Sequence, residues 1–411
     1  MELLDEPIAN LCRTCVVIPA KNEEARIEQC LHALINQIDL SGQRLDPRSF
    51  EIMLLVNNSQ DDTAKVARKF AQRHKCYTIH VLELELSSEN AHVGFVRRYL
   101  MDEAQRRLQG NGFTRSCIAT TDADTMVNKT WLAATLRALD MGADGVAGRI
   151  FLQRDYFKGD LRKVAQCYQW LTGYRQMLAY AEGLLAPVEC DPNPRHNQHG
   201  GASLAITAAF YKKIGGLTPV AFEEDVALYH SIRNAGGRFR HCPSVCVRTS
   251  ARPEGRVQKG LSSDSHRWRK AGQDPLSQQV EQCEITLERF RAIAAVRNLW
   301  YSKQFFNKFV DERKRLGIDR GVCDSISQSL ACPGLDGAWL QHALERAVHV
   351  EQIIVEIEQH IPLNDVCQSE PLSLAIEKLG QFLNGISGNS KTIGVRTNLI
   401  SILDASHKQS A

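Results

Sequence analysis

Short apolar runs alternate with amphipathic stretches from residue 15 to residue 152. The runs have the length of buried strands, and the stretches between them repeat apolar side chains every three or four residues, as amphipathic helices do. Strands that alternate with helices predict a mostly parallel sheet with helices on both faces, which is an α/β fold. The expected strands are 15–19, 51–56, 77–84, the run from Cys117, and 144–152, and the expected helices are 27–38, 64–74, 89–108 and 129–141.

The pattern changes after residue 152. We expect a long helix at 161–185, a Gly-led strand at 200–206, short helices at 208–214 and 226–234, a strand at 239–247, and helices at 285–299, 339–360, 372–383 and 397–403. The sequence therefore predicts a sheet-containing domain over 12–250 and a helical C-terminal region over 276–411. The basic segment 251–275 between them is either a linker or a lid. Its Arg252, Arg256 and Lys259 would close over phosphates in a lid, and would be solvated surface charge in a linker.

Composition and charge argue against several classes of protein. A formal net charge of +3 argues against a general nucleic-acid binder. There is no apolar run of about 18 residues, as a transmembrane segment would need, and the first ten residues lack the basic region of a secretory signal. Thirteen cysteines are scattered through the chain, several within apolar patterns, as buried thiols of a reducing compartment would be. We therefore expect a cytoplasmic protein with no nucleic-acid partner and no transmembrane segment.

Two aspartates follow the apolar run that begins at Cys117. In extended backbone, residues i and i+2 lie on the same side, so Asp122 and Asp124 would converge just past the strand. Open α/β sheets bind ligands at the carboxyl ends of their strands. Two carboxylates there suit Mg²⁺ or Mn²⁺, which proteins hold with one or two carboxylates plus substrate phosphates. An Asp-rich turn that caps the next helix is the alternative.

Polar elbows follow two earlier strands. Glu23 comes after the first strand, and the segment 57–62 (NNSQDD) comes after the second. Because the carboxyl ends of parallel strands meet at one edge of the sheet, we expect these side chains in the same crevice as Asp122, where they would contact a nucleoside. Taken singly, each is also a common cap or turn residue, because Asn, Ser and Asp side chains bond the local backbone.

A predicted helix start carries Glu224 and Asp225. The helix dipole favours acids in a first turn without any catalytic role. Successive helical residues point about 100° apart, so we expect at most one of the two acids to point into the crevice and the other to bind backbone or a basic neighbour. A carboxylate there could accept the proton of an acceptor hydroxyl as a general base. Of Arg97 and Arg98, one is expected to face the crevice and the other water.

Four motifs in this order resemble the family 2 glycosyltransferases, which have the GT-A fold. They are 17–24 (VIPAKNEE), 56–63 (VNNSQDDT), 122–124 (DAD) and 224–225 (ED), and the likeness covers residues 12–260. The resemblance implies a GT-A-like α/β fold and an enzyme that transfers a sugar from a nucleotide-diphosphate-sugar donor to an acceptor hydroxyl. It also implies a requirement for Mg²⁺ or Mn²⁺ and inversion of the anomeric centre.

The resemblance further implies roles for single residues. Asp225, within the Glu224-Asp225 pair, corresponds to the catalytic base. Asp124 corresponds to the direct metal ligand, with Asp122 as the other acid of its motif. The positions that correspond to donor-binding residues are Pro19, Ala20, Glu23, Asn58, Asp61, Arg97 and Asp122. Gly200-Gly201 lies where a Gly-led segment borders the acceptor and the diphosphate.

The chain departs from the family pattern in two places. Thr249 and Ser250 stand where many members have a His or Asp as a further metal ligand. The segment 265–268 (SHRW) keeps only part of the Gln-x-x-Arg-Trp signature of polymer synthases, so a processive synthase is not expected.

Two other functions remain open. A sugar-phosphate nucleotidyltransferase would carry a Gly-rich loop after the first strand, whereas residues 20–24 contain no glycine. A non-catalytic nucleotide-sugar-binding protein would retain the same acids. The sequence leaves the sugar, the nucleotide base and the acceptor (a small molecule, a lipid or a glycan) undetermined.

Overall fold

The computed structural model describes residues 4–153, 162–250, 275–307, 318–332, 334–361 and 368–386. The predicted linker or lid, with Arg252, Arg256 and Lys259, lies outside the described residues apart from its last residue, and so does the predicted helix 397–403. The chain divides into two compact units. Unit 1 is Met1–Ala165, His196–Ile232 and Gly237–Lys270, and unit 2 is Gln166–Arg195, Arg233–Gly236 and Ala271–Ala411.

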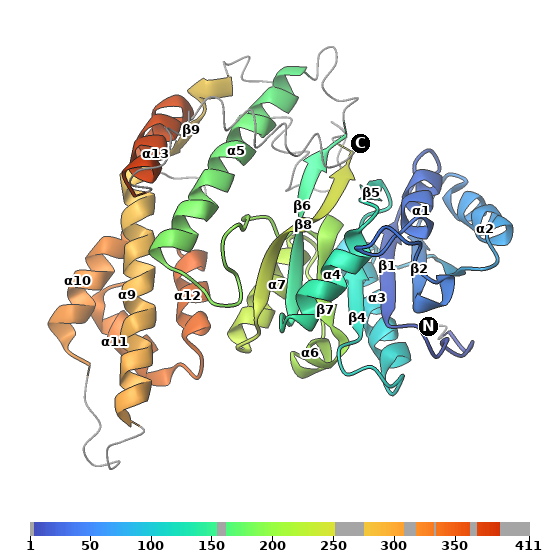
Figure 1. Cartoon of the computed structure of the whole chain (residues 1–411), viewed down its shortest axis with the longest axis horizontal. Coiled ribbons are helices and arrows are strands. Elements are labelled where there is room, and N and C mark those ends of the chain that lie inside the picture. Colours follow the sequence, from blue (N-terminus) through green and yellow to red (C-terminus); the bar gives the residue numbers. More distant parts are fainter. Residues whose placement is uncertain are drawn as a thin grey trace. The chain divides into compact units, whose positions relative to one another are not determined.

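Unit 1 contains an eight-stranded sheet with the order β3-β2-β1-β4-β7-β6-β8-β5 (Figure 1). Its strands are β1 (Thr14–Ala20), β2 (Phe50–Asn57), β3 (Thr78–Leu84), β4 (Cys117–Thr120), β5 (Thr125–Val127), β6 (Gly145–Leu152), β7 (Leu204–Thr207) and β8 (Phe239–Thr249). β1 pairs in parallel with β2 and β4, β2 with β3, and β6 with β8. β7 runs antiparallel to β4 and β6, and β5 runs antiparallel to β8. The predicted mostly parallel sheet is confirmed.

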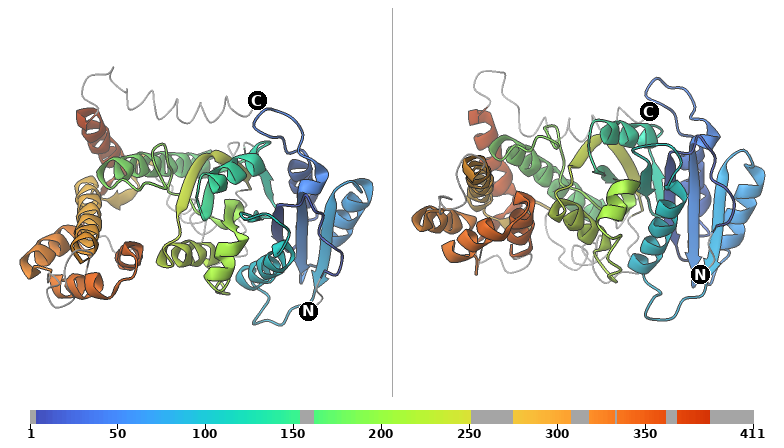
Figure 2. Two further views of the ribbon diagram at one scale, coloured as in Figure 1. Left: turned by 60° about the horizontal axis from the view of Figure 1, so that its bottom comes forward. Right: turned by 90° about the horizontal axis from the view of Figure 1, so that it is seen from below.

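Helices cover both faces of this sheet (Figure 2). They are α1 (Ile27–Ile35), α2 (Thr63–Arg73), α3 (Val93–Leu108), α4 (Trp131–Asp140), α6 (Ala208–Lys213) and α7 (Glu224–Asn234, in unit 1 up to Ile232), with the 3₁₀ turns η1 (Pro47–Ser49) and η4 (Gly201–Ser203). α3 packs on β1, β2 and β4, and α4 packs on β6, β7 and β8. With both faces covered, β2 is buried along its whole length, which fits the unbroken apolar run 52–56 within it.

The parallel register places the ends of β1, β2 and β4 at one edge of the sheet. Ala20, the last residue of β1, lies opposite Val56 near the end of β2. The polar elbows after these strands therefore lie along the same edge, as predicted. The short strand β5, which the sequence pattern did not predict, pairs Thr125 with Thr249. This pairing brings the end of β8 to the 122–124 segment.

Unit 2 is mainly helical. Its elements are α5 (Arg162–Leu185, in unit 2 from Gln166), α9 (Cys283–Asn307), α10 (Arg320–Leu330), α11 (Gly337–Arg346), α12 (Val350–Gln359), α13 (Leu372–Ile386), η5 (Pro275–Ser277) and the antiparallel pair β9 (Gln279–Glu281) and β10 (Ser369–Pro371). The helical C-terminal region is confirmed, but the single helix predicted over 339–360 is wrong. The chain leaves the helix at Ala347, and Gln352 accepts the backbone N–H of Val348 at 2.9 Å. This break allows both helices to bury apolar residues in one core with α9 and α10.

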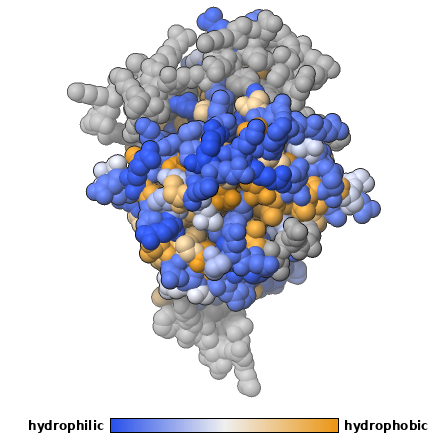
Figure 3. Space-filling model, turned by 90° about the vertical axis from the view of Figure 1, so that its right-hand side faces the viewer, coloured by the Kyte–Doolittle hydropathy of each residue, from blue (hydrophilic) through white to orange (hydrophobic). Residues whose placement is uncertain are grey.

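Among the described residues, no helix is long and apolar enough to cross a membrane. Figure 3 shows the face of unit 1 that carries α1 and α2, where hydrophilic residues surround smaller hydrophobic areas. Scattered apolar residues of this kind are normal at a protein surface.

Candidate active site

The 122–124 segment forms a turn directly after β4. The backbone N–H of Thr125 donates to the carbonyl oxygen of Asp122 at 3.0 Å and closes the turn. The backbone is therefore not extended here, and the carboxylates of Asp122 and Asp124 face different partners. Asp122 Oδ1 accepts a hydrogen bond from Arg97 Nη2 at 2.6 Å, and the Asp122 side chain is 38% exposed.

The Asp124 carboxylate lies against the end of β8. Thr249 Oγ1 donates to Asp124 Oδ1 at 3.3 Å, and the Ser250 hydroxyl donates to Oδ2. Thr125 Oγ1 in turn donates to Thr249 Oγ1 at 3.0 Å. The β5–β8 pairing thus positions two hydroxyls beside Asp124, at the two positions where the sequence departs from the pattern that the resemblance implies.

Arg97 lies at the centre of the polar cluster. Its three guanidinium nitrogens donate to Thr120 Oγ1 (3.0 Å), Asp122 Oδ1 (2.6 Å) and Glu224 Oε1. The Arg97 side chain is only 3% exposed. The side chain of its neighbour Arg98 is 39% exposed and forms an ion pair with Asp102, one helical turn away on the surface of α3. Arg97 therefore faces the polar cluster and Arg98 faces the surface, a division that is consistent with the one expected from the sequence.

Glu224 and Asp225 begin α7 and have different surroundings. Glu224 is buried and bound to Arg97, so this acid has a basic neighbour, as predicted for one member of the pair. Asp225 is partly exposed. Its Oδ2 accepts a hydrogen bond from the backbone N–H of Gly201 at 2.7 Å, and its Oδ1 accepts one from the backbone N–H of Val226 at 2.9 Å. The helix starts after Glu223, whose φ of 58° is left-handed and unusual for a residue other than glycine.

The cluster carries more negative than positive charge. Desolvation, opposed by Arg97 and aided by the charges of Asp124, Asp225 and Glu23, raises the pKa of Asp122 to about 6. Four acids therefore surround Asp122 when Glu224 is included, against one guanidinium. Such an excess of carboxylates is a setting in which a bound cation lowers the electrostatic energy.

The elbow after β1 is joined to the elbow after β2. The backbone N–H of Glu23 donates to Thr63 Oγ1 at 2.7 Å, and that of Glu24 donates to Asp61 Oδ2 at 3.1 Å. Asp61 Oδ1 also accepts the backbone N–H of Thr63 at 3.1 Å, so Asp61 acts as a turn residue just before α2. Glu23 is buried, and its charge reaches Asp122.

The remaining predicted donor-binding residues lie at the same edge. Pro19 and Ala20 end β1. Asn58, directly after β2, has a φ of 47° and exchanges hydrogen bonds with the backbone of Leu86, its Oδ1 accepting at 3.2 Å and its Nδ2 donating at 2.9 Å. Asn58 therefore binds local backbone, as such a residue commonly does. Its contacts are separate from those of Arg97.

The sequence analysis did not single out Thr120, which belongs to the cluster, or Gly94, where α3 makes a close approach. Thr120, the last residue of β4, accepts from Arg97 Nε and donates to the carbonyl oxygen of Gly201 at 3.4 Å. Gly94 on α3 has no room for a side chain, because a Cβ there would fall on the carbonyl oxygen of Val220. A Gly among helix formers was a signal for close packing, but a Thr in a strand gave none.

The oxygens at this edge fit a divalent cation of the Mg²⁺ or Mn²⁺ type. Asp124 and the partly exposed Asp122 offer the hard carboxylate ligands that these ions prefer. Among the described residues, no group of three or more His, Cys, Asp or Glu side chains forms a ready metal centre. The donor set therefore suits an ion held by one or two carboxylates and completed by phosphate oxygens and water.

Residues 15–193 match the family described as Glycosyl transferase family 2, in agreement with the resemblance noted in the sequence. No curated protein sequence matches the chain.

Several solved structures are similar to this one at low sequence identity. The mannosyltransferase PcManGT from Pyrobaculum calidifontis, in complex with GDP-Man and Mn²⁺, is 16% identical, with 97% of this chain and 80% of that chain covered at a TM-score of 0.40. TarS 1–349 from S. aureus, in complex with UDP, is 15% identical, with 84% and 89% covered at a TM-score of 0.42. Glucosyl-3-phosphoglycerate synthase from Mycobacterium tuberculosis, with Mn²⁺, UDP-Glc and phosphoglyceric acid, is 14% identical, with 64% and 82% covered at 0.35.

Proposed function

We propose that this protein, which carries a glycosyl transferase family 2 domain over residues 15–193, transfers a sugar from a nucleotide-diphosphate-sugar donor to an acceptor hydroxyl with inversion at the anomeric carbon. One observation carries the proposal. The acids of the 122–124 segment and those at the start of α7 are about a hundred residues apart in the chain, yet Arg97 binds one acid from each. One side chain thereby holds together the acids that the proposed transfer requires.

Asp225 is the proposed general base. Its carboxylate is partly exposed and held by the backbone N–H of Gly201, so one oxygen is oriented while the group stays within reach of a ligand. The acceptor oxygen attacks the anomeric carbon as its proton passes to Asp225, and the bond from that carbon to the diphosphate oxygen breaks on the opposite side. The products are the glycosylated acceptor and a nucleoside diphosphate. A positioned base of this kind contributes roughly 10²–10⁴ in rate.

Asp124, with Asp122, would hold Mg²⁺ or Mn²⁺. When bound, the ion would supply positive charge that stabilises the departing diphosphate. The hydroxyls of Thr249 and Ser250 orient the Asp124 carboxylate from the protein side. The elbows that contain Glu23, Asn58 and Asp61, with Pro19 and Ala20 at the end of β1, are the proposed nucleoside-binding edge.

The proposal is tested by nucleotide-sugar turnover with and without Mn²⁺. A panel of UDP- and GDP-sugars is incubated with the wild-type protein, and release of UDP or GDP is followed. Asp225→Asn is expected to lower kcat by roughly 10²–10⁴, because the base is lost. Asp124→Asn is expected to weaken the response to Mn²⁺.

A matched control is Asp140→Asn, which changes a surface acid that is 50% exposed. This variant should turn over donor at the wild-type rate. Unchanged rates in both site variants would overturn the proposal. Release of pyrophosphate from a nucleoside triphosphate and a sugar phosphate would identify a nucleotidyltransferase instead.

A further inference from the structure

Arg97 connects three segments of the proposed site. It reaches the end of β4 through Thr120 and Asp122, and the start of α7 through Glu224. It also covers η4, because a Cβ on Gly201 would lie 2.5 Å from Nη1 and 2.7 Å from Cζ of Arg97. These three segments contain the proposed metal ligands, the proposed base and the backbone N–H that holds it.

We propose that Arg97 and Glu224 are positioning residues that fix Asp122 and Asp225 relative to one another, and that neither contacts the donor or takes the acceptor's proton. This inference rests on the proposed function, since it assigns roles within the same site. It differs from the roles of donor ligand and member of the catalytic pair that the family resemblance implies for these two positions.

The burial and contacts of Arg97 argue against a donor ligand. Its side chain is 3% exposed, and three of its five N–H groups donate to protein oxygens. Because the guanidinium is buried, it would have to move away from Glu224, whose side chain is 6% exposed, to reach a diphosphate in solvent. An unpaired charge would then remain buried, which is strongly unfavourable.

The position of Glu224 argues against a base. Its carboxylate binds the Arg97 guanidinium and points into the protein interior, whereas an acceptor hydroxyl must arrive from solvent. The neighbouring residue Asp225, by contrast, is partly exposed to solvent. A general base must come within about 2.6–3.2 Å of the proton donor, and of the two acids only Asp225 has an open side.

The link from Arg97 to Asp225 runs through Gly201. Thr120 Oγ1 accepts from Arg97 Nε and donates to the Gly201 carbonyl oxygen, while the Gly201 N–H holds Asp225 Oδ2 at 2.7 Å. The Arg97 guanidinium lies directly over Gly201. A shift of Arg97 therefore moves both hydrogen-bonding groups of Gly201, and with them the base.

The experiment compares two conservative changes with one control. Arg97→Lys keeps the charge but loses the planar fork that spans two carboxylates, and Glu224→Gln keeps the shape but loses the charge. Arg98→Lys, on the exposed side of the same helix, is the control. For each variant we measure kcat, the donor KM, and the Kd of UDP or GDP with MnCl₂, using whichever nucleotide stabilises the wild type more. Circular dichroism gives the folded fraction.

If Arg97 and Glu224 are positioning residues, both Arg97→Lys and Glu224→Gln are expected to lower kcat by about 10- to 100-fold. The reason is that misplacement of a catalytic group by about 1 Å costs about 10²-fold in rate. The nucleotide Kd should change by less than about threefold in both. A tenfold weaker Kd in Arg97→Lys alone would show a donor ligand and overturn the inference. Wild-type kcat per folded molecule in both variants would also overturn it, and so would a larger loss in Glu224→Gln than in Asp225→Asn.

A second readout does not depend on activity. The Trp131 indole N–H donates to Ser203 Oγ in η4 at 2.9 Å, so a ¹⁹F resonance from 5-fluorotryptophan at this position reports on η4. It is assigned with Trp131→Phe. The resonance should move in Arg97→Lys and Glu224→Gln and stay in place in Arg98→Lys. An unmoved resonance in all three would overturn the link to η4. Absence of any transfer or nucleotide release by the wild type would instead overturn the proposed function, and the resonance would still decide the link.

Discussion

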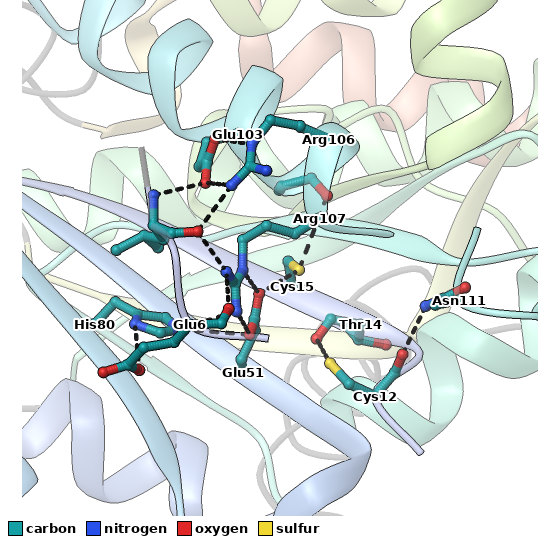
Figure 4. A network of polar contacts seen from close by, with 12 residues as sticks. Glu6, Cys12, Thr14, Cys15, Glu51, His80, Glu103, Arg106, Arg107 and Asn111 are labelled. Carbon is teal, nitrogen blue, oxygen red and sulfur yellow. Dashed lines mark hydrogen bonds and ion pairs between the residues drawn. The ribbon is translucent and has the colours of Figure 1, made fainter. Parts of the chain in front are cut away.

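The helix α3 carries two buried arginines with different surroundings, Arg97 near its start and Arg107 near its end. Each has a side chain that is 3% exposed and an ion pair with a buried glutamate. Arg97 lies at the edge where β1, β2 and β4 end. Arg107 lies where β1 and β2 begin, and Figure 4 shows it between Glu51 and the N-terminal segment. The same residue type on one helix thus occupies the two opposite edges of the sheet.

In the Arg107 cluster, the charge of the arginine is balanced by one buried glutamate. Nε and Nη2 donate to the two oxygens of Glu51 at 2.6 and 2.8 Å, and Nη1 donates to the carbonyl oxygen of Glu6 at 2.8 Å. Burial alone would raise the pKa of Glu51, but hydrogen bonds from Arg107, His80 and Cys15 outweigh it and lower the pKa to about 2. One cation meets one buried anion in bidentate geometry, which is the strong form of such a pair.

In the Arg97 cluster, the acids outnumber the arginine, and negative charge is left over. Its guanidinium is shared between Asp122 and Glu224, further acids lie close by, and the pKa of Asp122 is raised by burial rather than lowered. Charge that is balanced within the protein stabilises the fold, whereas charge left over at a partly exposed edge is available to a ligand. The comparison supports a role in stability for Arg107 and the proposed role in the site for Arg97.

The largest expected effect comes from Arg107→Gln. Removing one partner of a buried pair leaves the other charge unpaired and costs about 3–5 kcal/mol. The loss is measured as the free energy of urea unfolding of unit 1. Transfer rate per folded molecule should stay at the wild-type value. A variant with normal stability but slow transfer would reverse the comparison.

Acidification should affect the same cluster. Glu51 has a pKa lowered from 4.5 to about 2, so its stabilisation is fully present above pH 4.5 and is lost as the pH falls towards 2. The shift corresponds to about 3 kcal/mol. Free energies of unfolding are measured between pH 6 and pH 2 for the wild type and Glu51→Gln. The wild type should lose stability more steeply below pH 4.5, and parallel curves would contradict the assignment.

A smaller effect is expected from Gly201→Ala, which tests the Arg97 side of the comparison. The added Cβ would lie 2.5 Å from Arg97 Nη1 and must displace a guanidinium that three oxygens hold. Overpacking of this kind costs about 1–3 kcal/mol, and we expect kcat to fall about tenfold. Gly385→Ala in α13 is the matched control, because its Cβ would meet nothing within 4 Å. Equal effects of the two changes would argue against a packed Arg97.

The smallest expected effect comes from Arg98→Gln. Its pair with Asp102 is largely exposed, and such pairs are worth about 0–1 kcal/mol. Urea unfolding and donor turnover should both match the wild type. A loss of turnover here would mean that the charge of α3, rather than the placement of Arg97, matters for the site.

The strands and helices around the site could be predicted from the sequence because each has a strong local pattern. The apolar run of β2 and the heptad-like spacing in α1 predict these elements from the local sequence alone. β5 could not be predicted in this way, because three residues carry no periodicity and its pairing partner lies more than a hundred residues away. The break at Ala347 between α11 and α12 carries no Gly or Pro, so only the packing of unit 2 reveals it.

The sequence by itself determined the α/β sheet, the edge at which polar residues gather, and the acids at that edge, because strand ends and motif spacing are local properties. It could say that at most one of Glu224 and Asp225 would point into the crevice while the other bound backbone or a basic neighbour, but helix geometry did not decide which. Tertiary structure decided that Glu224 binds Arg97, that Gly201 holds Asp225, and that β8 supplies hydroxyls to Asp124. These contacts join segments far apart in the chain, and their geometry depends on how the whole sheet is paired and packed.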